Sequence, residues 1–110
     1  MKKIFACFLL LFSAMACAGT QTAKVVGYIP YDSGGKQFFF LSLQNNVSGG
    51  CNTTGRFVID SNQLKFKGVQ AAVMAAFHSG TEINVQYNET CNTYVGSWDL
   101  AYVCVGNIAC

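Results

Sequence analysis

The side chains best suited to chemistry in this sequence are aromatic residues that stand beside small polar residues in predicted loops. Sugars stack their apolar faces on aromatic rings, and neutral hydroxyl and amide groups hydrogen-bond to sugar hydroxyls. The pattern therefore indicates carbohydrate recognition. The alternative is that Trp98 and the tyrosines fill the protein interior. The aromatic candidates are Tyr28, Tyr31, Tyr94 and Trp98, and their polar neighbours are Ser33, Asn52, Asn92 and Thr93.

Residues that could support catalysis are sparse. The lone histidine, His78, is predicted at a helix C-terminus, where the helix dipole favours its cation. Asp60 has the position of a helix N-cap rather than that of a general base. There is no nucleophile elbow or phosphate-binding loop, and no Cys-x-x-Cys pair for zinc. The sequence predicts a protein that is not an enzyme, with no cofactor and no metal site.

Composition narrows the class of protein further. Hydrophobic residues make up 52% of the 110 residues and charged residues only 11%, which excludes a disordered chain or a highly charged coiled coil. The formal charge is +2, but Lys2 and Lys3 lie in a predicted signal peptide, so the rest of the chain is neutral. Without a basic surface, nucleic acid is not an expected partner.

Residues 1–18, MKKIFACFLLLFSAMACA, are typical of a secretory signal peptide. Two lysines precede an apolar run that is too short for a permanent membrane span, and Ala16-Cys17-Ala18 is a cleavage motif. Cleavage there leaves one small domain, residues 19–110, in a secreted or periplasmic protein. The alternative is lipid anchoring at Cys17, because residues 14–17 weakly resemble a lipobox. An integral membrane protein is not expected.

Four cysteines follow the signal peptide, an even number that suits an oxidising compartment. Three pairings are possible, and we favour Cys51–Cys91 with Cys104–Cys110. The first disulfide would close a long loop, and the second would hold the C-terminus in place.

Hydrophobic periodicity predicts strands over residues 24–31, 38–43, 56–59, 81–87 and 97–105, with a turn at 32–35. Pro30 is expected to end its strand or to place it at a sheet edge. Phe39, Leu41 and Leu43 should share one face. A lone helix between the third and fourth strands is the layout of an OB-fold, a five-stranded barrel, and an α+β roll is the alternative.

The helix is predicted from about Gln63 to Ser79, capped by Asp60 or Ser61 and closed by Gly80. The helix face opposite its predicted core stripe carries small and apolar residues, where a helix exposed to solvent normally carries charges. Either alanine serves only as a helix former, or this face packs on another subunit. The predicted core stripe is Phe66, Val69, Val73, Ala76 and Phe77, and the opposite face includes Leu64, Gly68, Ala71, Met74 and Ala75.

The stretch from Phe66-Lys67-Gly68-Val69-Gln70 to Ser79-Gly80-Thr81-Glu82-Ile83-Asn84-Val85 resembles the binding subunits of subtilase-cytotoxin and typhoid-toxin type bacterial toxins. Cys104 and Cys110 look like that family's C-terminal cysteine pair. Small secreted bacterial proteins share a similar core. The resemblance covers residues 25–110 in layout, with identity confined to short pieces.

The resemblance implies an OB-fold subunit that forms a homopentameric ring, binds sialylated glycans and carries an enzymatic toxin subunit. Arg56 lies near the place where the family has a basic sugar contact. The chain departs from the family before its first strand, where it lacks the Tyr-Tyr-Ser-Asp segment that grips sialic acid, and its cysteine pattern differs. The family's glycan site is therefore not carried over.

Two functions remain open at this point. The first is a glycan-binding toxin-type subunit with candidate ligand contacts Tyr31, Ser33, Arg56 and Trp98 and an oligomer face at Ala71, Met74 and Ala75. The second is a stand-alone periplasmic or outer-membrane-associated OB-fold protein with a structural, inhibitory or stress role.

Overall fold

The structure, a computed structural model, describes residues 18–45 and 47–110. The predicted signal peptide, apart from Ala18, and the alternative lipidation site Cys17 lie outside the described residues. The predicted order of five strands and one helix is confirmed within the described chain. The elements are β1 (Ala18–Ser33), β2 (Lys36–Leu43), β3 (Phe57–Asp60), α2 (Phe66–Ser79), β4 (Glu82–Asn88) and β5 (Trp98–Val105).

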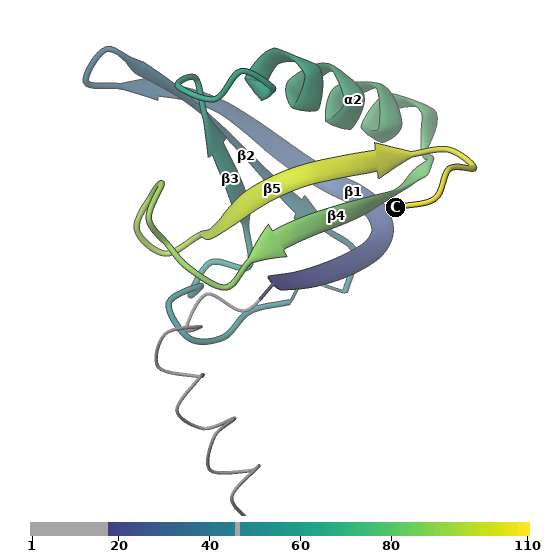
Figure 1. Cartoon of the computed structure of the whole chain (residues 1–110), viewed down its shortest axis with the longest axis horizontal. Helices are drawn as coiled ribbons and strands as arrows, with labels where there is room; N and C mark the ends of the chain where they lie inside the picture. The colour runs from purple at the N-terminus through teal and green to yellow at the C-terminus, as the bar shows by residue number, and fades with distance from the viewer. Residues whose placement is uncertain (1–17, 46) are drawn as a thin grey trace, which may run out of the picture.

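The five strands form one closed sheet in the order β1-β2-β3-β5-β4, with β4 pairing back to β1 (Figure 1). All neighbouring strands are antiparallel except β3 and β5, which run parallel over two pairs, Phe57 with Trp98 and Val58 with Asp99. Helix α2 packs against β1, β4 and β5. The described part of the chain is therefore mostly β, with a single helix on a closed sheet.

Strand β1 is longer than predicted because it has two different partners. Residues 18–24 pair with β4, and residues 25–33 pair with β2, with a register shift between Val25 and Gly27. Beyond Lys24, β1 is paired on one side only among the described residues. Pro30 therefore lies on a free edge, where its missing N–H costs no ladder hydrogen bond. Of the two outcomes predicted for Pro30, the edge position is correct.

The interior of the sheet follows the predicted alternation. Phe39, Leu41 and Leu43 of β2 are buried, as are the alternate residues Ile83, Val85 and Tyr87 of β4. The aromatic centre of this core is a stack of Tyr87 on Trp98, with ring centroids 5.0 Å apart and an angle of 6° between the planes. Gly19 lies against this stack, because a Cβ added there would fall 2.5 Å from the Tyr87 ring.

The helix starts later than predicted, and its predicted cap is wrong. Helix α2 begins at Phe66, and its N-cap residue, Lys65, makes no side-chain capping bond. Asp60 instead ends β3, where its carboxylate accepts a hydrogen bond from the Asn62 N–H at 3.0 Å and pairs with Lys36 at 3.7 Å. Residues 61–65 form turns that bring the chain from the sheet edge to the helix.

The other end of the helix is close to prediction. Gly80 closes it in the left-handed conformation at φ 70°, which favours glycine. The predicted core residues Phe66, Val69, Val73 and Ala76 are buried, but Phe77 is 38% exposed. Phe77 lies at the flank of the stripe, where its ring meets Tyr28 edge-on at a centroid distance of 5.5 Å.

Both favoured disulfides, Cys51–Cys91 and Cys104–Cys110, are present. They indicate an oxidising extracellular or periplasmic environment. Within the described part of the chain, no helix is long and apolar enough to cross a membrane.

Candidate functional site

The candidate site lies on the outer surface of the sheet, over β1, β2 and β3. It originates in the run Phe38-Phe39-Phe40 of β2. Phe39 points into the core, so Phe38 and Phe40 point outward, opposite Tyr31 and Ile29 of β1 respectively. Phe40 is nevertheless only 3% exposed, because neighbouring side chains cover it. A second aromatic layer therefore stands outside the barrel.

Tyr94 covers this layer from the loop between β4 and β5. Its ring meets Phe40 edge-on at a centroid distance of 5.0 Å and Phe38 at 5.1 Å. Tyr31 reaches the same ring at 6.2 Å, also edge-on. A shallow groove of about 210 Å³ remains between these rings. We call it the aromatic groove, and its lining residues are Ile29, Tyr31, Phe40, Arg56 and Tyr94.

Arg56 gives the aromatic groove a positive charge. Its guanidinium lies 4.6 Å from the centroid of the Phe40 ring, within the range of a cation–π contact. Among the described residues, the only ion pair is Lys36–Asp60, so no carboxylate neutralises Arg56. The Nε of Arg56 is buried and has no hydrogen-bond partner among the described residues. Because no carboxylate of the described residues pairs with it, the guanidinium keeps unused capacity to bind an anion.

Asn52 fixes the backbone that carries Arg56. Its side chain is buried, and its Oδ1 accepts hydrogen bonds from the Gly55 N–H at 3.0 Å and the Arg56 N–H at 3.3 Å. Its amide donates to the Val47 carbonyl at 3.3 Å. Asn52, considered from sequence as a ligand contact, is used up by these bonds and positions Arg56.

Asp99 holds the loop that carries Tyr94. Its carboxylate accepts hydrogen bonds from the backbone N–H of Asn92 at 3.1 Å and of Thr93 at 2.8 Å, and from the hydroxyl of Thr90. Asn92 and Thr93 thus contribute backbone groups to loop structure.

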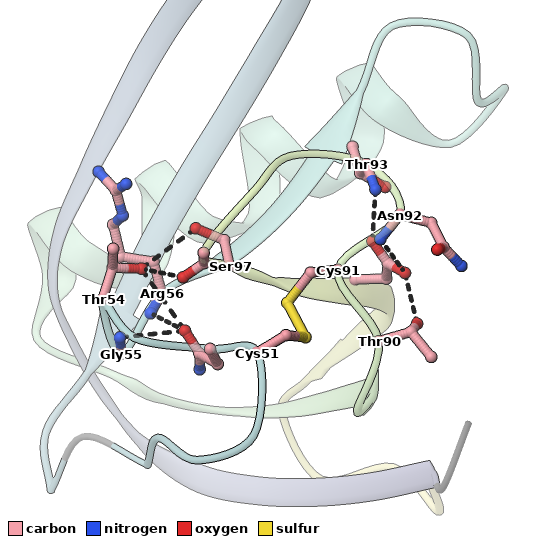
Figure 2. The surroundings of a disulfide bond; sticks show 12 residues. Cys51, Thr54, Gly55, Arg56, Thr90, Cys91, Asn92, Thr93 and Ser97 are labelled. Carbon is pink, nitrogen blue, oxygen red and sulfur yellow. Dashed lines mark hydrogen bonds between the residues drawn. A yellow bond between two sulfur atoms is a disulfide. The ribbon is translucent and has the colours of Figure 1, made fainter. Parts of the chain in front are cut away.

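The Cys51–Cys91 disulfide joins these two loops. Figure 2 shows Gly55 and Arg56 on one side of it and Thr90, Asn92 and Thr93 on the other, with the Arg56 side chain pointing away from the sulfur atoms. The bond thus connects the segment that presents Arg56 to the segment that presents Tyr94. The geometry of the aromatic groove therefore depends on a disulfide between cysteines that are 40 positions apart in the sequence.

The structure brings together only two of the four predicted ligand contacts. Tyr31 and Arg56 both line the aromatic groove. Ser33 lies on the same outer side of β1 but at the exposed hairpin end, opposite Lys36. Trp98 is 5% exposed and stacks on Tyr87 inside the sheet. This is the interior role that the sequence analysis gave as the alternative to a ligand contact.

Phe40 and Ile29 were not singled out from the sequence. The available signal was the Phe38-Phe39-Phe40 run itself, because three aromatic residues in a row on a strand must place rings on both of its faces. The sequence indicated Tyr94 only as one of four aromatic candidates, without a signal that it contacts Phe40.

Other sequence candidates lie elsewhere. His78 shares a hydrogen bond of 3.0 Å with the Tyr28 hydroxyl. Ala71 and Ala75 of the proposed oligomer face are exposed, and Met74 is partly buried against the core. In residues 18–45 and 47–110 there is no cluster of three or more histidine, cysteine or acidic side chains that could hold a metal ion.

Comparison with known proteins does not assign this site. The chain matches no protein-family model, and no curated protein or solved structure is significantly similar to it.

Proposed function

We propose that this protein is a secreted, non-catalytic binding protein that takes an acidic sugar, such as a sialylated glycan, in the aromatic groove. The observation that carries this proposal is the un-neutralised Arg56 guanidinium beside the rings of Tyr31 and Tyr94. A sugar ring stacks on the aromatic side chains, and its carboxylate pairs with the guanidinium.

Titration with methyl sialoside tests this proposal directly. Arg56→Gln should weaken binding about tenfold or more, because a charge-assisted hydrogen bond is lost. Tyr31→Ala should also weaken it, through loss of stacking. Tyr102→Ala is the matched control, since Tyr31 and Tyr102 are each 45% exposed and Tyr102 lies on β5, away from the groove. Equal affinity in all three variants would reject the groove as the sugar site.

We further propose that the closed sheet is an OB-fold. Its support is the strand order β1-β2-β3-β5-β4 with the helix between β3 and β4. Small barrels of this type bind oligosaccharides and other ligands on their outer strands and loops.

If the protein is a toxin-type binding subunit, we propose that it forms a pentameric ring and carries an enzymatic subunit as partner. The exposed Ala71 and Ala75 would then lie on a subunit contact. Light scattering of residues 19–110 should then give about five times the mass of one chain. Ala71→Glu should dissociate such a ring. Val95→Glu, at an 82% exposed position in the loop between β4 and β5, serves as the charge control away from the helix. A monomeric wild type would favour the stand-alone periplasmic or outer-membrane-associated role instead.

A further inference from the structure

A second cavity lies at the far end of the β1–β2 hairpin, on the side opposite the aromatic groove. The rows Asp32–Gln37 and Ser33–Lys36 pair only between β1 and β2, because β3 stops at the row of Phe38 and Asp60. The hairpin thus extends past the closed sheet toward the first turns of α2 (Figure 1). We call the space of about 430 Å³ there the hairpin cleft, lined by Pro30, Tyr31, Asp32, Gln37, Phe38, Phe66 and Gln70.

Three polar side chains of the hairpin cleft stand at positions that are in phase with the core. Asp32 and Gln37 face each other two rows beyond Pro30 and the fully buried Phe39, so they lie on the inner side of the hairpin. Gln70 follows Phe66 by one helical turn and therefore shares its side of α2. Asp32 and Gln37 are exposed and Gln70 is partly buried, so all three side chains can reach a ligand in the cleft.

These polar side chains are not used within the protein. Among the described residues, the side chains of Asp32, Gln37 and Gln70 make no hydrogen bond, and Asp32 makes no ion pair. The backbone N–H of Gln37 is bonded to the Ser61 hydroxyl at 3.0 Å, but its side-chain amide is available. The hairpin cleft thus offers one carboxylate and two carboxamides to a ligand.

The lining of the hairpin cleft selects a neutral ligand that carries many hydroxyl groups. A carboxylate accepts two hydroxyl hydrogen bonds, and a carboxamide both donates and accepts. Pro30 and Tyr31, which are both exposed, add apolar surface for the ring face of a sugar. None of the lining residues is cationic, and Asp32 repels anions, so the site suits neither a phosphate nor an acidic sugar. We infer that the hairpin cleft is a binding site for a neutral sugar residue.

Tyr31 lines both the hairpin cleft and the aromatic groove. Beyond Lys24, β1 pairs only with β2 among the described residues, so a ligand can pass over its other, free edge from one cavity to the other. One oligosaccharide can then place an acidic residue at Arg56 and a neutral residue between Asp32 and Gln70. This joint occupancy rests on the proposed function, whereas neutral-sugar binding in the cleft does not.

The test is an NMR titration of the oxidised protein with neutral disaccharides, namely lactose, maltose and cellobiose, followed by sialyllactose and methyl sialoside. A neutral disaccharide should shift the side-chain amide signals of Gln37 and Gln70, and Gln70→Ala should remove these shifts. Gln70→Ala and Asp32→Asn should each weaken sialyllactose binding about fivefold, the size of one net hydrogen bond, without changing methyl sialoside binding. Lys67→Ala, on an exposed part of the same helix, should change neither.

The two proposals fail in different ways. If neutral disaccharides shift only groove residues, or shift nothing while Gln70→Ala leaves sialyllactose affinity unchanged, the cleft proposal is overturned. If disaccharides bind at Gln70 but methyl sialoside does not bind at Arg56, the cleft proposal stands and the acidic-sugar function falls.

Discussion

The two outer surfaces of the sheet differ in how they use their side chains. Over β1 and β4 the outer surface is a ladder of short polar residues, which we call the polar face: Thr20, Thr22, Asn84 and Gln86. Asn84 donates to the Thr22 hydroxyl at 2.7 Å, Gln86 donates to the Thr20 hydroxyl at 2.7 Å, and Gln86 also bonds to Asn84. Over β1, β2 and β3 the outer surface is aromatic and carries Arg56.

The polar face has its hydrogen-bonding groups satisfied within the protein, whereas the aromatic groove does not have its polar and aromatic groups fully satisfied. The polar face pairs its donors and acceptors with each other, so a ligand would have to replace existing hydrogen bonds and gain little. The aromatic groove leaves a guanidinium without a carboxylate and rings without full cover. Binding there adds interactions without breaking any, which is why we place the ligand on the aromatic side.

The largest expected contrast is between the two disulfides. Replacing Cys51 and Cys91 with alanine should lower the free energy of unfolding by about 4 kcal/mol, because the loop that they close is long. Replacing Cys104 and Cys110 should cost only about 2 kcal/mol, because their sequence separation is 6. Urea denaturation of both double variants measures the difference, and equal midpoints would contradict the loop-length argument.

The variant that lacks Cys51 and Cys91 should also bind sugar more weakly, even under conditions where it remains folded. The reason is that the loops that carry Arg56 and Tyr94 are no longer joined. The variant of Cys104 and Cys110 is the control and should bind normally.

A smaller contrast concerns the aromatic layer itself. Phe40→Ala should destabilise the protein by about 3 kcal/mol, because a buried ring is removed and a cavity is left. Tyr102→Ala, a substitution of a half-exposed ring, should cost less than about 1 kcal/mol. Chemical denaturation of the two variants checks this, and a cost below 1 kcal/mol for Phe40→Ala would show that the outer layer is not packed as a second core.

The smallest effect is a pH dependence in the core beneath the polar face. Burial, and secondarily the charge of Glu89, raise the pKa of Tyr87 above its usual value of 10.0. The folded protein therefore holds this proton more tightly than the unfolded chain does. The resulting stability is fully present below about pH 10 and is lost as the pH rises through the raised pKa.

In thermal unfolding experiments, the wild type should lose stability between neutral and strongly alkaline pH. Tyr87→Phe should lose less stability than the wild type over the same range. Tyr102→Phe, on the exposed outside of β5, should behave like the wild type. An unchanged alkaline slope in Tyr87→Phe would mean that this tyrosine does not contribute to it.

Local patterns predicted much of the fold. The alternation of Phe39, Leu41 and Leu43 follows from the two-residue period of a strand, and the stop at Gly80 follows from its left-handed conformation. The helix start was misplaced because Asp60 resembles an N-cap in sequence, whereas the Lys36 side chain and the Asn62 N–H bind it at the end of β3. The missed start of β1 depends on β4, more than 60 positions away.

The sequence by itself indicated an oxidising compartment and determined the order of elements and the inward faces of β2 and β4, because these depend on composition and on short-range periodicity. Only the tertiary structure decided that Tyr31, Phe40, Arg56 and Tyr94 form one groove while Trp98 is interior. These residues come from four separate segments, and their meeting depends on strand register, on the curvature of a closed sheet and on a disulfide between distant loops. No local pattern encodes such distances.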